Sequence, residues 1–168
     1  MPSIELLLDD TAEQELRGEW ATLADAGLPS QARHTGESNR PHVTLIYSET
    51  PLEPPPISGL PLEIAVASPV VLGSARRGFV LARMVRATHE LLAVHADLHA
   101  RVAREARIDA LTLPGSWTPH VTLARRLTPP LLAEALGLLD VRRAIPATVS
   151  EARLWESTTR TVTPLRTL

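Results

Sequence analysis

The sequence contains no cysteine, no lysine and few aromatic residues: three Trp, one Tyr and one Phe. Without cysteine, neither a disulfide framework nor a cysteine-ligated zinc site can form. No apolar run approaches the roughly 18 residues that are needed to span a bilayer. The first ten residues lack the basic segment of a signal peptide, so we expect a cytoplasmic protein without membrane contact. The formal net charge of −2 argues against binding of long duplex nucleic acid through bulk charge.

The rest of the composition is that of a globular protein. Of 168 residues, 44% are hydrophobic and 21% are charged, which suffices for one core in a single domain spanning residues 1–168. All 17 basic residues are arginine. Arginine is the better bidentate phosphate ligand, but the coding bias of a genome explains a lysine-free chain equally well. We expect a monomer.

One five-residue string, Pro-His-Val-Thr-Leu, occurs twice, once around His42 and once around His120. Both copies are rich in β-branched and apolar residues and begin with proline, which is typical of the start of a strand. Because side chains alternate along a strand, His42 shares one face with Thr44, and His120 shares one face with Thr122. A chance repeat of five residues in a chain of this length is rare. Each copy therefore presents an imidazole and a hydroxyl together, which is the layout of a functional site.

The segments that precede the two motifs follow the same order. A strand over residues 3–8 and a helix over about 12–26, opened by a capping box that starts at Thr11, precede the first motif. A strand over 79–83 and a helix over 87–107 precede the second. This agreement in order and length indicates an internal duplication.

The remaining elements complete an α+β pattern. Residues 62–72 are predicted as a strand and 73–78 as a hairpin loop. After the second motif we expect a helix over about 129–139 and strands over about 147–155 and 159–166.

The expected architecture is bilobal, with two mostly antiparallel sheets related by a pseudo-twofold axis. The repeated units run roughly over residues 3–72 and 79–155. The two His-x-Thr motifs are expected to face each other across a central cleft, with about 5–8 Å between the nearest imidazole nitrogens, so that both reach one phosphate.

Two histidines and two threonines suit proton transfer at a phosphodiester. Histidine has an ordinary pKa of about 6.5, so one ring can be neutral while the other is protonated. His42 and His120 would supply a general acid and a general base, each contributing roughly 10²–10⁴-fold. Thr44 and Thr122 can donate to the non-bridging oxygens of a bound anion. A 2′,3′-cyclic phosphate is a natural substrate, because its ring strain favours opening. No metal and no cofactor are required.

The paired motifs resemble those of the 2H phosphoesterase superfamily, and within it the bacterial RNA 2′,3′-cyclic phosphodiesterases, also called 2′-5′ RNA ligase-like proteins. The segments His42–Leu45 and His120–Leu123 match both motifs in full. The resemblance implies metal-independent hydrolysis of cyclic phosphates, on RNA ends or nucleotides, or of 2′-5′ linkages. It also implies that His42 is the acid and His120 the base, which the sequence alone does not distinguish. The first motif continues as Ile-Tyr-Ser-Glu rather than as the aromatic-Leu-Gly of that branch, so the exact substrate stays open.

Other residues near the motifs are weaker candidates. Arg125 follows the second motif threonine by three positions and points to the opposite face unless the strand bends. Tyr47 and Trp117 flank the motifs and are placed either to stack on a base or to pack in the core. His34 and Arg40, in the loop before the first motif, are candidates for lining the cleft.

Two alternatives compete with catalysis by the motif histidines. His95 and His99 have the i, i+4 spacing of paired zinc ligands on the 87–107 helix, with His89 further upstream. No Glu follows His95, and its place on the apolar stripe favours a buried structural histidine instead. The other alternative is a non-catalytic module that binds nucleotides or RNA ends on the same fold. Two intact motifs argue against it.

Overall fold

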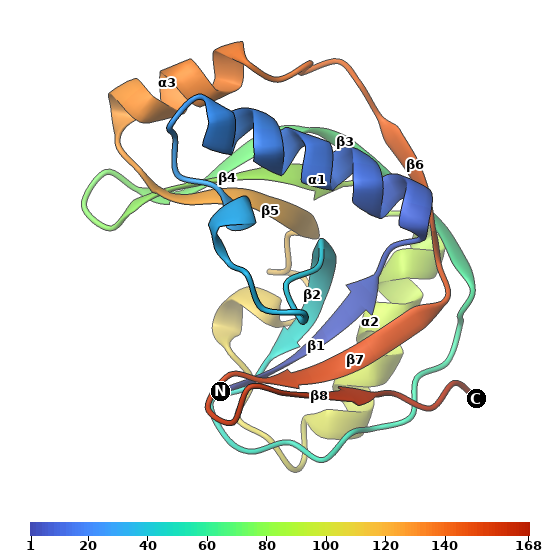
Figure 1. Cartoon of the computed structure of the whole chain (residues 1–168). Coiled ribbons are helices and arrows are strands. Elements are labelled where there is room, and N and C mark those ends of the chain that lie inside the picture. Colours follow the sequence, from blue (N-terminus) through green and yellow to red (C-terminus); the bar gives the residue numbers. More distant parts are fainter.

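Two four-stranded antiparallel sheets form the protein, and three α-helices cover them (Figure 1). The computed structural model describes residues 1–168. In chain order the elements are β1 (Pro2–Leu7), α1 (Asp10–Asp25), β2 (His42–Tyr47), β3 (Leu62–Ser74), β4 (Gly78–Val85), α2 (His89–Val102), β5 (His120–Leu127), α3 (Pro129–Gly137), β6 (Ile145–Val149), β7 (Glu151–Glu156) and β8 (Thr161–Pro164). The predicted α+β class with two antiparallel sheets is confirmed.

The two sheets share one plan. The first sheet has the order β2-β1-β7-β8, and the second has the order β5-β4-β3-β6. Each motif strand is therefore the edge strand of its own sheet. The two edge strands, β2 and β5, lie next to each other without forming a backbone ladder. This contact between sheet edges brings the two copies of the repeated string together.

The sheets exchange strands between the two halves of the chain. The predicted units, 3–72 and 79–155, do not coincide with the sheets, because β3 lies in the second sheet while β7 lies in the first. The predicted strand over 147–155 is two strands, β6 and β7, which are separated at Ser150 and pair in different sheets. A continuous run of strand-forming residues does not reveal this change of partner.

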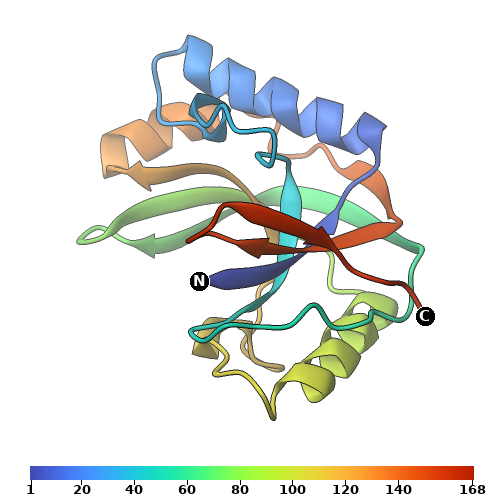
Figure 2. The ribbon, with the colours of Figure 1, turned by 60° about the horizontal axis from the view of Figure 1, so that its bottom comes forward.

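The helices are exchanged as well. Helix α1 follows β1 of the first sheet but packs, with α3, against the second, whereas α2 follows β4 of the second sheet and covers the first (Figures 1 and 2). The indole of Trp20 on α1, for example, donates to the carbonyl oxygen of Thr122 on β5 at 3.0 Å. A single core cluster of 33 buried residues joins both sheets. None of the helices is long and apolar enough to cross a membrane.

Helix α1 begins earlier than the capping box at Thr11 predicts. The helix is capped by Asp9, whose Oδ1 accepts from the amide of Ala12 at 3.1 Å and whose Oδ2 accepts from the amide of Thr148 at 2.5 Å. Burial raises the pKa of Asp9, but these amides together with that of Thr11 hold the pKa below its ordinary value. Asp9 is the better cap because it also ties α1 to β6.

Helix α2 ends at Val102, earlier than the predicted end at residue 107. Leu91, Leu98 and Val102 form its buried stripe, and no residue from 103 to 107 is buried. Without an apolar face to pack, the last five residues of the predicted helix leave the helical conformation.

A buried arginine fixes α1 on the second sheet. Arg83 on β4 is 0% exposed, and its Nη2 and Nε donate to the carboxylate of Glu19 on α1 at 2.5 and 3.1 Å. The remaining donors of Arg83 bond to the carbonyl oxygens of Ala67, Asp140 and Arg143. The guanidinium is satisfied on all sides, so its charge is tolerated in the core.

Removal of the carboxylate from this pair should destabilise the fold. We expect Glu19→Ala to lower the free energy of unfolding by about 3 kcal/mol, because it leaves the buried guanidinium of Arg83 without its counter-charge. Denaturant unfolding measures this change. The matched control is Glu15→Ala on the same helix, whose partner Arg143 is exposed; it should cost less than about 1 kcal/mol. Equal losses in the two variants would contradict the role given to Arg83.

Candidate active site

The two motif strands are joined directly by a tryptophan. Trp117, three residues before His120, donates its indole N–H to the carbonyl oxygen of Thr44 at 2.9 Å. The corresponding oxygen of the second motif, that of Thr122, accepts from the indole of Trp20. A tryptophan thus holds the backbone of each motif threonine, and this hydrogen bond does not involve the threonine hydroxyl.

The two motif histidines have the same internal hydrogen bond. Nδ1 of His42 lies 2.7 Å from the carbonyl oxygen of Arg40, and Nδ1 of His120 lies 2.7 Å from that of Thr118. A carbonyl oxygen only accepts, so Nδ1 carries the proton in both rings. In a neutral ring this leaves the lone pair on Nε2. Nε2 is therefore the atom at which each ring can take up or release a proton.

The charge state of His120 depends on its surroundings. Burial lowers the pKa of His120 below its ordinary value; the carbonyl oxygen of Thr118 opposes this, and the positive charges of Arg125 and His42 add to it. His120 is accordingly the ring that favours the neutral state.

Strand β5 is irregular next to Arg125. The pairing of β4 with β5 shifts register on both sides of Leu81, and Arg126 has a positive φ of 60°. Such bulges redirect side chains at the end of a strand. These irregularities lie where the bend that the sequence analysis required would occur, and a phosphate contact by Arg125 stays a prediction.

His42 lies beside a buried ion pair. Glu5 on β1 is 2% exposed and accepts from Ser3 Oγ at 2.7 Å and from Arg153 Nε at 2.8 Å. Its Oε1 is 3.6 Å from Nε2 of His42. A protonated His42 ring would therefore form an ion pair with a carboxylate that the fold already holds in place.

A hollow of about 460 Å³ opens in front of His42. Its lining consists of Glu5, Arg33, His34, Thr35, Gly36, Ser38, Asn39, His42, Arg153, Trp155 and Arg160. His34 thus lies at the same hollow as the motif histidine, as the sequence suggested. His120 is not among the lining residues, and its link with His42 is instead the contact between β2 and β5.

The remaining candidates near the motifs have structural partners. Arg40 bonds through Nε to Glu13 at 2.7 Å and lines an adjoining hollow instead of the one at His42. The ring of Trp117 stacks on His95, with centroids 4.1 Å apart, so packing occupies the face that a base would need. Tyr47 is 36% exposed at the end of β2, and its role stays a prediction.

The helix histidines are not arranged as metal ligands. His95 is buried with Nε2 2.9 Å from the carbonyl oxygen of Thr112, and its pKa is lowered mainly by burial. No group of three or more His, Cys, Asp or Glu side chains in residues 1–168 is gathered as a metal site. The stack of His95 on Trp117 instead supports the residue that joins the two motifs.

Sequence reasoning missed Glu5, Arg153 and Trp155. Glu5 alternates with Ile4 and Leu6, which places it on the face opposite the core, but nothing in the local sequence names its partner. Arg153 is 148 residues away and meets Glu5 only because β1 pairs with β7. Trp155 lies on the same face two residues further along β7.

Comparisons with known proteins support one family. The model of the 2′-5′ RNA ligase superfamily matches residues 13–161. No curated protein has a significantly similar sequence. Among solved structures, Kluyveromyces marxianus Usb1 with uridine monophosphate is similar with a TM-score of 0.54 and 13% identity, covering 98% of this chain and 97% of that one. A structure described as a phosphoesterase has a TM-score of 0.53 and 16% identity, covering 98% and 94%. At these identities the structures support the fold alone.

The surroundings of His120 predict how its titration responds to mutation. We expect Arg125→Gln to raise the pKa of His120 toward the ordinary value of about 6.5, because a neighbouring positive charge is removed. Ring proton shifts followed by NMR across pH measure this. Arg126→Gln, the adjacent residue, is the control and should leave the titration unchanged. An identical pKa in Arg125→Gln and the wild type would contradict the arrangement.

Proposed function

The chain belongs to the 2′-5′ RNA ligase superfamily of 2H phosphoesterases, and we propose that it is a phosphodiesterase acting on 2′,3′-cyclic phosphates or 2′-5′ linkages. The observation that carries the proposal is the matched pair of histidines on adjacent edge strands, each with Nδ1 bonded to a carbonyl oxygen and Nε2 left for chemistry. Two such rings that reach one phosphate can move one proton in and one proton out.

The different surroundings favour His120 as the base and His42 as the acid. A base must be neutral to accept a proton, and burial and nearby positive charge lower the pKa of His120. An acid must be protonated, and the carboxylate of Glu5 near Nε2 of His42 provides a counter-charge for that state. The family resemblance implies the same assignment.

The reaction on a cyclic phosphate follows from these roles. Nε2 of His120 takes a proton from water as the water oxygen forms a bond to phosphorus. The bond from phosphorus to one ribose oxygen breaks on the opposite side, and that oxygen receives the proton of His42. The product is a phosphate monoester. Transfer of one proton from His120 and one to His42, through solvent, restores the starting state.

The motif threonines would bind the charged oxygens of the phosphate. Thr44 and Thr122 share the strand faces of the two histidines, and their carbonyl oxygens are already bonded to indoles. We expect their hydroxyls to donate to the non-bridging oxygens, where charge increases in the transition state. Neither this step nor the proton transfers involve a metal ion.

A nucleotide or an RNA end is the proposed substrate. The hollow at His42 holds arginines and a tryptophan, which are groups that bind phosphate and stack on bases. The similarly folded Usb1 has a structure with uridine monophosphate, which agrees with a nucleotide ligand. A non-catalytic binding module on this fold is the second candidate, and it predicts that the histidines can be replaced without loss of function.

Replacement of the histidines separates enzyme from binder. With EDTA present, we expect the wild type to hydrolyse a 2′,3′-cyclic nucleotide, and His42→Ala or His120→Ala to lose about 10²–10⁴-fold in kcat. The double variant should lose little more, because the two rings act as a unit. Thr44→Val and Thr122→Val should each weaken the transition state by about 1–3 kcal/mol.

Several results would oppose this mechanism. A folded double variant that retains the wild-type rate would exclude the two histidines as acid and base. Activity that disappears in EDTA and returns with zinc would favour a metal site at the helix histidines. His99→Ala on α2 is the control for histidine loss, and it should keep wild-type turnover.

The pH dependence of the rate should be bell-shaped. The acid limb should lie below about pH 6.5, the ordinary histidine value, because protonation inactivates the base and the pKa of His120 is lowered. The basic limb reports loss of the proton from the acid. Both limbs are measured by initial rates at saturating substrate. A range of about pH 4–9 covers the titration of histidine side chains. A rate that rises monotonically with pH would show that no protonated acid is needed.

A further inference from the structure

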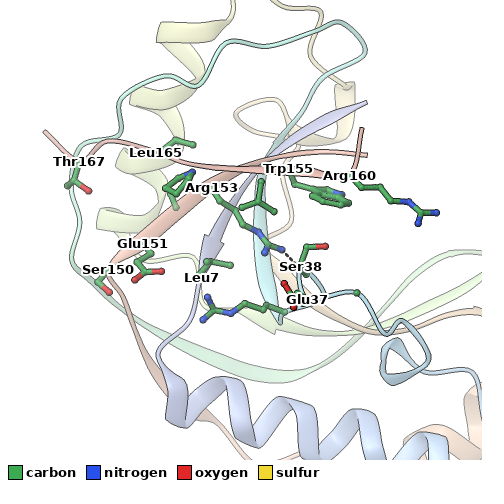
Figure 3. Close-up of a pocket in the computed structure, with 15 residues that line it drawn as sticks. Leu7, Glu37, Ser38, Ser150, Glu151, Arg153, Trp155, Arg160, Leu165 and Thr167 are labelled. Atoms are coloured by element: carbon green, nitrogen blue, oxygen red, sulfur yellow. Dashed lines mark hydrogen bonds between the residues drawn. The ribbon is translucent and has the colours of Figure 1, made fainter. Parts of the chain in front are cut away.

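The hollow at His42 does not end at that residue. It adjoins a second and larger hollow of about 850 Å³ on the same sheet (Figure 3). Five residues line both: Gly36, Ser38, Arg153, Trp155 and Arg160. The combined groove is much larger than a single cyclic phosphate needs, and the larger part alone has the volume of sites that hold complete small-molecule ligands, roughly 300–1,000 Å³.

The register of the first sheet explains why the two hollows are continuous. Glu5 pairs with Thr44 on one side and with Arg153 on the other, so these three side chains lie on one face. His42, two residues before Thr44, lies at the Leu7 end of that face, and Trp155, two residues after Arg153, lies at its Ser3 end. The hollow at His42 therefore crosses this face diagonally, from the proposed acid to the tryptophan, over the buried side chains of Glu5 and Arg153.

The loop before β2 is fixed along this groove. Nη2 of Arg153 donates to the carbonyl oxygen of Ser38 at 2.8 Å (Figure 3). Nε of the same side chain donates to the carboxylate of Glu5. One buried arginine thus connects the loop to the floor of the groove beside His42. The walls are positioned by the fold and do not depend on a ligand.

Two side chains at the junction of the hollows are free to bind. Trp155 is half-buried, and its indole N–H has no partner in residues 1–168. Arg160, in the turn before β8, makes no hydrogen bond and no ion pair. Figure 3 shows both side chains extending from the same end of the sheet. An aromatic face and an unpaired guanidinium are the groups that hold a base and a phosphate.

The larger hollow suits a base or a sugar better than a second phosphate. Its lining includes the apolar side chains of Leu7, Val162 and Leu165 together with the carboxylates of Glu37 and Glu151. The carboxylates would repel a phosphate lying deep in this hollow. A phosphate is therefore expected near Arg160, at the junction, with the attached nucleoside beyond it.

We infer that Trp155 and Arg160 bind the nucleotide that precedes the reactive one, so that the substrate is an oligonucleotide end and not a free mononucleotide. The inference rests on the proposed function, because it extends the site at which His42 acts. The stacked base and the paired phosphate add binding energy remote from the reacting bond, which a mononucleotide cannot supply.

Comparison of two substrates tests this inference. We expect kcat/KM for a trinucleotide with a 2′,3′-cyclic end to exceed that for the corresponding cyclic mononucleotide by at least about tenfold, since one stacked base is worth about a factor of ten. Trp155→Leu and Arg160→Gln should each reduce this ratio several-fold, mainly through a higher KM for the trinucleotide. Arg142→Gln, an exposed arginine outside both hollows, is the control and should keep the ratio.

The outcomes separate the inference from the proposed function. If neither substrate is hydrolysed, the proposed function fails and the inference fails with it. If both are hydrolysed with equal kcat/KM, or if neither variant changes the ratio, the function stands and the inference is wrong. Should Trp155→Leu fold poorly by circular dichroism, Arg160→Gln decides the question alone, because that residue is exposed and unpaired.

Discussion

The geometry of the site depends on the hydrogen bond from the Trp117 indole to the carbonyl oxygen of Thr44. The motif strands are edge strands of separate sheets, so no backbone ladder sets their relative position. The shared core and the bond from Trp117 do so instead, and Trp117 is itself fixed by its stack on buried His95. In the proposed mechanism His42 and His120 act on one phosphate, which requires that this contact keep the two sheet edges together.

The two motif histidines have equivalent backbone positions but different charged neighbours. Both rings have the same Nδ1 bond, so symmetry places two equivalent nitrogens at the site. Acid-base catalysis requires that they differ. The surroundings of the two rings differ through residues outside the repeated string: Glu5 lies beside His42, whereas burial and the charge of Arg125 lower the pKa of His120. Under the proposed mechanism, the repeated motif supplies the geometry and its unrepeated neighbours supply the difference between acid and base.

Much of the local structure could be predicted from the sequence, because it depends on neighbouring residues. The motif strands, the three helices and the turn over 73–78 follow from alternation, helical stripes and glycine positions. The cap at Asp9, the division of a strand at Ser150 and the pairing of Glu5 with Arg153 could not be predicted. Each depends on which distant strand lies alongside. The amide of Thr148 on β6, for example, donates to the carboxylate of Asp9. Register across 148 residues is a property of the whole fold and has no local signal.

The exchange of strands and helices between the halves is reciprocal. The first half gives α1 and β3 to the second sheet, and the second half gives α2, β7 and β8 to the first (Figures 1 and 2). Each sheet is therefore complete only with strands from both halves of the chain. A chain cut at the turn between β3 and β4 would leave two fragments, neither of which contains a complete sheet. We expect such fragments to be unstructured apart and to fold only on association, so the site exists only when both halves are present.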